Sequence, residues 1–324
     1  RYVSMLHSVI AAATTAWHYL CRTPPQVRPS LYFASQMQLD ARIMMMNRLL
    51  LDPSECSEVD GQLVASLDPQ DRRTKHVREV LRGEDGSQLR AGVLDAGSTD
   101  EATVMWHPPN ALDERSLQVS LGPAGRMLRP LAENMRPRLD LLLAMPRPRQ
   151  FARLLPMIAS LGVDNLWVTG AQRVELNYFS SHLLRKDNAA GLRAALVEGC
   201  EQSGDTAIPR VHVRPNLRKL LNQELLTQNN FDLLLVAHPL RDGMAPLRIA
   251  DLSVPQGKLL LAIGPERGWE EPGELDLFRD HGFRQVTLGS RTLRTDVAVI
   301  SLLAVINEWC ANPRRDRPDK SALS

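Results

Sequence analysis

The chain has 324 residues, which is enough for two domains of about 100–200 residues each. Hydrophobic residues make up 44% and charged residues 23%, a composition typical of folded proteins and not of disordered ones. The four cysteines form no CxxC pair, so neither a zinc site nor a disulfide framework is indicated. No run approaches about 18 consecutive apolar residues, so we predict no membrane partner, and a net charge of +2 neither indicates nor excludes nucleic acid.

Residues 1–43 differ in composition from the rest of the chain. The stretch 1–39 contains arginines, Ser, Thr and Ala but no Asp or Glu, which resembles an organellar transit peptide. The alternative is a leader that precedes a true start at one of Met44–Met46. We expect a mitochondrial or plastid location in the first case and a cytoplasmic one in the second, and residues 1–43 are left out of the fold prediction.

Residues 44–125 alternate short strand-like runs with turns. The runs at 46–51, 82–97 and 101–107 are bounded by Gly, Pro and Asp, as strands often are. Residues 68–82 have apolar side chains at helical spacing, and Asp68 before Pro69 is a candidate N-cap. The pattern predicts a small barrel-like β domain with one helix.

A Pro- and Arg-containing linker at 126–135 precedes a second domain at 136–312, and a polar tail at 313–324 is expected to be disordered. In the second domain apolar strands alternate with helices, which predicts a mostly parallel sheet covered on both faces. The expected strands are 139–145, 165–170, 211–213, 231–237, 258–264 and 284–289, and the expected helices are 151–162, 189–202, 217–226, 271–282 and 296–309.

Three strand ends in the last third of the chain are rich in turn residues. They are 237–243 (AHPLRDG), 263–269 (IGPERGW) and 288–296 (LGSRTLRTD). Ligands of parallel α/β sheets bind beyond the carboxyl ends of strands, so these loops are the candidate site. Neither GxxxxGK[ST] nor GxSxG occurs, and no GxGxxG follows the first strand, which disfavours P-loop, hydrolase and ordinary dinucleotide-binding folds.

The pair IGPERGW and LGSRTLRTDVA resembles the GPEGG and LGxRILRxETA motifs of the RsmE family. Three further segments resemble the same family in the same order, HVREVLR (76–82), SLGVDNLWV (160–168) and EGCEQSGDTAIPRV (198–211). The resemblance implies an α/β fold of the SPOUT superfamily with a carboxyl-terminal trefoil knot, preceded by a PUA-like β-barrel. It also implies a homodimer that transfers methyl from S-adenosylmethionine to uridine N3 of small-subunit ribosomal RNA.

Several positions depart from the family pattern. Arg267 replaces the second glycine of GPEGG, and Asp296 replaces the Glu of ETA. Arg147-Pro148 stands where Lys-Gly is usual, and Asp205 stands where Arg follows EQSG. We interpret the chain as a divergent branch similar to eukaryotic organelle-type relatives, with the exact RNA target as the feature most affected.

The resemblance implies a cofactor pocket made by the three loops. Glycine and proline backbone groups would meet the adenine and methionine ends, and Ile263, Leu288 and Leu293 would form apolar walls. The same residues are also compatible with simple turns and core packing. The predicted cofactor residues are His238, Pro239, Ile263, Gly264, Pro265, Gly268, Leu288, Gly289, Leu293 and Thr295.

The expected chemistry needs a base or a cation. Uracil N3 carries a proton and is not nucleophilic until that proton leaves. We predict Arg294 as the group that stabilises the anion and Asp296 or Glu266 as the base. The alternatives are a structural ion pair for Arg294, a helix cap for Asp296 and a loop-holding role for Glu266. No metal is expected, since the sulfonium already provides the leaving group.

A basic cluster on the first helix is the predicted RNA-binding surface, with further arginines near the pocket. A solvated helix face is the alternative for the cluster. The predicted RNA-binding residues are Arg72, Arg73, Lys75, Arg78, Arg173 and Arg291. Two other functions stay open: another SPOUT methyltransferase that acts on a ribose hydroxyl or on transfer RNA, and a non-catalytic RNA-binding factor in ribosome assembly.

Overall fold

The computed structural model describes residues 48–108, 115–125, 128–129, 138–185, 188–239 and 247–311. The predicted leader at 1–43, most of the predicted linker at 126–135 and the predicted tail at 313–324 lie outside these residues.

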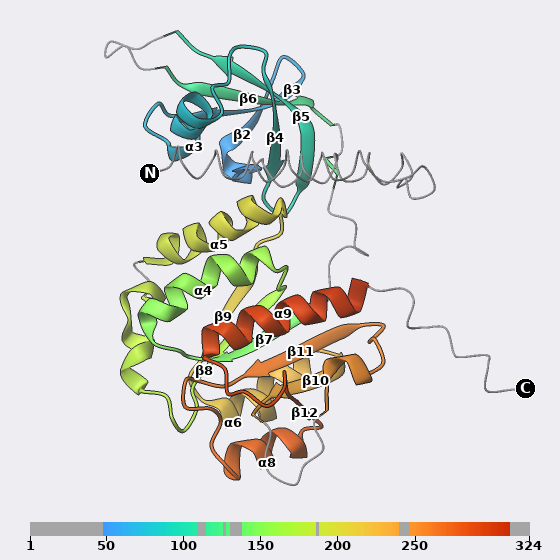
Figure 1. Ribbon diagram of the computed structural model, residues 1–324. Coiled ribbons are helices and arrows are strands. Elements are labelled where there is room, and N and C mark those ends of the chain that lie inside the picture. Colours follow the sequence, from blue (N-terminus) through green and yellow to red (C-terminus); the bar gives the residue numbers. More distant parts are fainter. Residues whose placement is uncertain are drawn as a thin grey trace, which may run out of the picture. The chain divides into compact units, whose positions relative to one another are not determined.

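The first half of the described chain forms a six-stranded mixed sheet (Figure 1). Its strands are β1 (Leu49–Leu51), β2 (Cys56–Val59), β3 (Gln62–Leu67), β4 (Gln88–Val93), β5 (Gly97–Trp106) and β6 (Leu117–Pro123), in the order β1-β4-β5-β6-β3-β2. Within the described residues β1 and β4 pair in parallel, and the other ladders of this sheet are antiparallel. Alternate residues of β6, Leu117, Val119 and Leu121, are buried, as expected for a strand with one face on a core.

The helix of this region is shorter than the sequence predicts. An α-helical turn, α3 (Arg72–Lys75), continues as a π-helical turn, η3 (His76–Val80). Asp71, and not Asp68, is the N-cap, because its side chain accepts a hydrogen bond from the backbone N–H of Arg73. Asp68 instead closes the preceding turn by accepting from the Gln70 N–H, so the prediction of a helix from 68 was wrong at its start.

The second half confirms the predicted parallel α/β sheet. The strands are β7 (Leu139–Ala144), β8 (Asn165–Thr169), β9 (Arg210–Arg214), β10 (Phe231–Ala237), β11 (Lys258–Ile263) and β12 (Arg284–Val286), in the order β12-β10-β11-β7-β8-β9. Every ladder of this sheet in the described residues is parallel. Strand β7 is buried at all positions, as in a sheet covered on both faces.

Helices cover both faces of this sheet (Figure 1). One face packs against α4 (Pro148–Ser160), α5 (Ala189–Ser203) and α9 (Thr295–Ala311), and the other packs against α6 (Leu217–Leu220) and α8 (Gly273–Asp280). The turns η8 (Leu221–Leu225) and α7 (Leu226–Gln228) prolong α6. The remaining short turns are η2 (Pro53–Glu55), η5 (Leu176–Ser180), η6 (His182–Leu184) and η9 (Ile249–Asp251).

Helix α4 begins earlier than its apolar spacing suggests. Pro148 occupies its first turn, where a missing N–H costs nothing. Pro156 lies inside the helix, which nevertheless continues to Ser160. The chain then turns at Gly162, whose φ of +75° places it in the left-handed region expected after a helix.

Strands β12, β10 and β11 are neighbours in the parallel sheet. Because parallel strands end at the same edge, the segments that follow them meet there. This arrangement brings together the three turn-rich segments singled out in the sequence.

Candidate active site

A cavity of about 350 Å³ lies beyond the carboxyl ends of β10, β11 and β12. Its volume falls within the range of small-molecule sites, roughly 300–1,000 Å³. It is lined by Arg173, Ala237, His238, Pro239, Ile263, Gly264, Pro265, Glu266, Arg267, Gly268, Glu271, Val286, Thr287, Leu288, Arg291, Thr292, Leu293, Thr295, Ala298 and Leu302.

The loop after β11 folds back tightly on itself. The Gly268 N–H donates to the Pro265 carbonyl (2.8 Å), and Gly268 has a φ of +68°, a conformation that favours glycine. A Cβ at Gly264 would lie 3.0 Å from the Trp269 nitrogen, so this position has little room for a larger residue. Trp269 is fully buried against Phe278, with ring centroids 4.7 Å apart, and anchors the loop in the core.

Backbone and side-chain contacts join this loop to its neighbours. The Arg147 N–H, which follows β7, donates to Glu266 Oε1 (3.0 Å). The Arg173 guanidinium, which follows β8, donates to the Arg267 carbonyl (2.7 Å). The loop is therefore held from two adjacent strand ends, and one oxygen of the Glu266 carboxylate is used in holding it.

The segment after β10 contributes an imidazole. His238 Nε2 is bonded to the carboxylate of Glu271, which lies just before α8. The His238 side chain is buried, and its Nδ1 has no partner among the described protein atoms. A buried ring nitrogen without a partner at the wall of a cavity is a group that a ligand can satisfy.

The segment after β12 supplies the apolar side of the cavity. Leu288 and Leu293 line it and are only partly covered, with 39% and 37% of their surface exposed. Gly289 does not line the cavity, although it was predicted to do so. Its backbone N–H and carbonyl both bond to the hydroxyl of Thr287 (3.3 and 2.9 Å), so it shapes the turn that presents Leu288.

The structure brings the predicted cofactor residues together, with the exception of Gly289. His238, Pro239, Leu293 and the others all line one cavity, although they come from three separate segments. Their role in binding a cofactor stays a prediction.

The predicted catalytic residues differ in whether they line the cavity. Glu266 lines the cavity, whereas Arg294 and Asp296 do not. Arg294 Nη2 lies 2.8 Å from Asp296 Oδ2, and the Arg294 side chain is 77% exposed. This is the ion pair that was left open as the alternative for Arg294. Asp296 lies inside the first turn of α9 and not at a cap position. The catalytic roles of Arg294 and Asp296 stay predictions, and the cavity geometry does not support them.

Two arginines of the predicted RNA-binding cluster, Arg72 and Arg73, bond to carboxylates within the protein. Arg73 donates to the carboxylates of Glu55 (2.6 and 2.8 Å) and Asp71 (2.7 and 3.0 Å), and its side chain is only 15% exposed. The hydrogen-bonding groups of Arg73 are therefore already satisfied within the protein, so its contact with RNA stays a prediction that this geometry does not support. Arg78 is exposed and lies 3.2 Å from Glu79, and Lys75 is half-buried.

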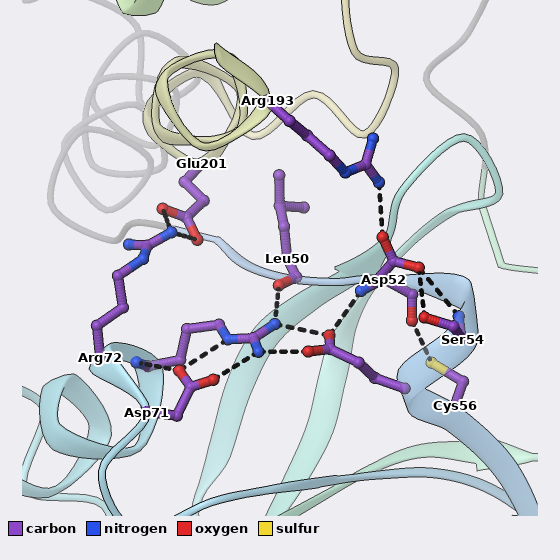
Figure 2. A network of polar contacts seen from close by, with 10 residues as sticks. Leu50, Asp52, Ser54, Cys56, Asp71, Arg72, Arg193 and Glu201 are labelled. Atoms are coloured by element: carbon purple, nitrogen blue, oxygen red, sulfur yellow. Dashed lines mark hydrogen bonds and ion pairs between the residues drawn. The ribbon is translucent and has the colours of Figure 1, made fainter. Parts of the chain in front are cut away.

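Two further ion pairs in Figure 2 join helix α5 to Arg72 of α3 and to Asp52, which follows β1. Arg72 Nη2 contacts both oxygens of Glu201 (2.8 Å each), and Arg193 contacts Asp52 (2.6 Å). We call the side chains of Asp52, Glu55, Asp71, Arg72, Arg73, Arg193 and Glu201 the carboxylate network.

The pKa values of this network follow from its contacts. Hydrogen bonds from Ser54, and then from Arg193, lower the pKa of Asp52 to about 2. Hydrogen bonds from Arg73 lower the pKa values of both Glu55 and Asp71. The ionised carboxylates are thus stabilised by folding, which is the signature of a structural network.

Two cavity residues were missed in the sequence. Arg267 was treated only as a lost glycine, yet it lines the cavity with Arg173 and Arg291. No motif in the sequence pointed to Glu271, because its partner His238 is 33 residues away in the chain.

Within the described residues no group of three or more His, Cys, Asp or Glu side chains is arranged to hold a metal ion. No helix in these residues has the length and apolar character needed to cross a membrane.

Comparison with known proteins places the chain in a family. The model of the RNA methyltransferase domain family matches residues 133–307. The ribosomal RNA small subunit methyltransferase E of Treponema pallidum is 31% identical over 266 residues, which cover 81% of this chain and 90% of that protein. A protein of Borreliella burgdorferi with the name ribosomal RNA small subunit methyltransferase E 1 is 22% identical and covers 71% of this chain and 87% of its own length.

Solved structures share the fold. A crystal structure of ribosomal RNA small subunit methyltransferase E from Neisseria gonorrhoeae bound to S-adenosyl methionine has a TM-score of 0.59 and 20% identity, covering 82% of this chain and 98% of that one. A methyltransferase from Legionella pneumophila in complex with the same cofactor has a TM-score of 0.58 and 22% identity, with the same coverage. From the matched domain and the 31% identical relative, the chain belongs to the RsmE family of S-adenosylmethionine-dependent RNA methyltransferases.

Proposed function

We propose that this protein transfers a methyl group from S-adenosylmethionine to N3 of a uridine in small-subunit ribosomal RNA. The observation that carries the proposal is the cavity at the ends of β10, β11 and β12, built by the same loops whose motifs resemble the RsmE family. The names of the relatives support ribosomal RNA as the substrate, and the family resemblance supports uridine N3 as the acceptor.

The residues of the cavity fit S-adenosylmethionine. Ile263, Leu288 and Leu293 offer apolar surface for the adenine ring, and the loop from Gly264 to Gly268 offers backbone polar groups at close range. The buried and unpartnered Nδ1 of His238 is a further polar group at this wall. When bound, the sulfonium supplies an activated methyl group.

The protein must also handle the proton on uracil N3. A carboxylate at the cavity can accept this proton, and a guanidinium can stabilise the uracil anion at its carbonyl oxygens. Glu266 keeps its predicted role as base through the oxygen that does not bind the Arg147 N–H. Arg291 takes the role predicted for Arg294, because Arg291 lines the cavity and Arg294 does not.

We also propose that the second domain contains a trefoil knot and that the first domain is a PUA-like barrel. Strand β12 pairs with β10 at the sheet edge, whereas α9 packs against α4 and β11. The chain between them must therefore cross back over the strand ends, and the Thr287 N–H bonds there to the Leu247 carbonyl (3.2 Å), in the connection from β10 to β11. This crossing supports a threaded chain. The mainly antiparallel first sheet is compatible with a barrel.

A homodimer is the proposed assembly. Val297 and Val305 of α9 are exposed apolar residues, as are Leu288 and Leu293 beside the cavity. Exposed apolar side chains that gather near a site are common at protein interfaces. Analytical ultracentrifugation of the wild type and of Val297→Asp would test this, and a monomeric wild type would contradict it.

Calorimetric titration with S-adenosylmethionine and S-adenosylhomocysteine is the first test of the enzyme. We expect saturable binding that is lost in Gly264→Val, because a bulky side chain would collide with the backbone at Trp269. A well-folded protein that binds RNA but neither cofactor form would favour the non-catalytic assembly factor.

The acceptor is tested by methylating a small-subunit ribosomal RNA transcript with labelled cofactor and digesting it to nucleosides. We expect 3-methyluridine. A ribose-methylated nucleoside, or activity on transfer RNA only, would replace the proposed acceptor while leaving the methyltransferase assignment in place.

A further inference from the structure

We propose that Arg267, together with Arg173, binds a phosphate of the RNA strand beside the target nucleotide, next to Arg291, which meets the uracil. We call these three residues the arginine rim. The proposal rests on the proposed function and specifies where the RNA backbone lies relative to the cavity.

The arginine rim combines exposure with a position on the cavity. All three side chains are exposed to solvent, and all three line the cavity, so they lie at its open side. They come from the segments after β8, β11 and β12, far apart in the sequence. The cofactor is expected deeper, where Ile263 and Gly264 are buried.

The rim arginines form no ion pair with a carboxylate in the described residues. Two carboxylates line the same cavity: Glu266 accepts from the Arg147 backbone N–H, and Glu271 is bonded to His238. Among the described residues Arg267 and Arg291 take part in no ion pair. Arg173 donates to a neutral partner, the Arg267 carbonyl, which sets its position against the loop, and it too has no ion pair within the part of the chain that the structure describes.

The chemistry of the rim favours a phosphodiester. The planar guanidinium matches a phosphate with two parallel hydrogen bonds and is weakly hydrated, which suits exchange of water for an anion. Clustered cations at a cavity mouth also attract a polyanion more than a neutral nucleoside. The carboxylate of the cofactor is the other anion that this site can meet, and the experiment below separates the two.

Arg267 is the informative position because it replaces the second glycine of the GPEGG motif that this loop otherwise resembles. A side chain added there extends the rim without altering the backbone turn, since the left-handed residue of the loop is Gly268. We therefore infer that this chain makes a phosphate contact that a glycine at position 267 cannot make.

The test compares Arg267→Ala with Arg279→Ala by measuring the affinity for a small-subunit ribosomal RNA transcript at several salt concentrations. Arg279 is the matched control because it is exposed, lies on α8 outside the cavity, and its loss changes the net charge equally. Affinity for S-adenosylhomocysteine is measured in parallel by calorimetry, and a thermal unfolding curve checks the fold of each variant.

We expect Arg267→Ala to weaken RNA binding about tenfold, as loss of a charge-assisted hydrogen bond does, and to lower the slope of log affinity against log salt by about one. Cofactor affinity should not change. Arg267→Lys should keep the slope and recover part of the affinity, and Arg267→Gly should behave as Arg267→Ala does. Arg279→Ala should match the wild type.

Equal RNA affinity and salt slope in Arg267→Ala and Arg279→Ala would overturn the proposal. Weaker binding of S-adenosylhomocysteine in Arg267→Ala would also overturn the proposal, because it would show that the rim binds the carboxylate of the cofactor. Failure of the proposed function is seen separately, as a wild type that binds transcript and cofactor but forms no 3-methyluridine.

Discussion

Arginine gathers in two regions of this protein with opposite consequences. In the carboxylate network each arginine meets carboxylate oxygens, and Arg73 is shared by Glu55 and Asp71. In the arginine rim no guanidinium forms an ion pair with a carboxylate in the described residues, and the exposed arginines line the cavity. The first region uses arginine to hold structure together, and the second leaves arginine available to a ligand.

The partners of an arginine, and not its residue type, decide what its side chain does. A guanidinium whose donors are all satisfied within the protein would have to break those bonds to reach RNA. A guanidinium that faces water exchanges only water for phosphate. The sequence shows both groups as arginines in basic surroundings and cannot separate them.

The largest effect on stability is expected from Arg73→Ala. The substitution leaves two partly buried carboxylates without their partner, and loss of one member of such a pair is strongly destabilising. We expect the free energy of unfolding, measured by urea denaturation, to fall by about 2–3 kcal/mol. RNA affinity at a temperature where the variant is folded should be unchanged, and a lower salt slope would show that Arg73 does contact RNA.

A smaller loss of stability is expected from Glu201→Gln. Glu201 is buried on α5, but its partner Arg72 is 63% exposed, and water can replace the lost contact. The free energy of unfolding should fall by about 1 kcal/mol. Arg72→Ala should lower it by a similar amount, and additive effects in the double variant would contradict a direct pair.

Because of the carboxylate network, the free energy of unfolding should depend on pH in the acidic range. The pKa of Asp52 is lowered from its ordinary value of 3.8 to about 2 in the folded protein, and those of Glu55 and Asp71 are lowered as well. The stability that these groups contribute is fully present above their ordinary pKa values, 3.8 for the two Asp residues and 4.5 for Glu55, and is lost as pH falls toward 2. Urea midpoints measured at pH 5, 4 and 3 should decline, and the decline should be shallower in Asp52→Asn. An identical pH dependence in the wild type and in Asp52→Asn would show that Asp52 does not contribute to this effect.

The smallest effect on stability is expected from Arg291→Ala. An exposed arginine without an ion pair in the described residues contributes within about 0.5 kcal/mol. The rate of methyl transfer in a single turnover should nevertheless fall at least about tenfold, because the arginine stabilises charge in the transition state. Arg294→Ala, at an exposed position outside the cavity, serves as the comparison, and an equal or larger loss of rate there would restore the catalytic role predicted from the sequence.

The order of the elements and the location of the site follow from the sequence alone. Strands such as 231–237 and 258–264 are covered on both faces of a parallel sheet, so they are near-continuous apolar runs that can be recognised without tertiary information. The motifs at 263–269 and 288–296 placed the cavity correctly, since parallel strands that end at one edge must bring their loops together.

Which charged residues can meet a ligand depends on tertiary packing. The pairs Arg72–Glu201 and His238–Glu271 join residues that are distant in the chain, and no local pattern encodes them. Whether a guanidinium meets a carboxylate or water depends on which elements pack side by side. This packing assigns Arg73 to the structural network and Arg267 to the cavity, although both are arginines in polar segments.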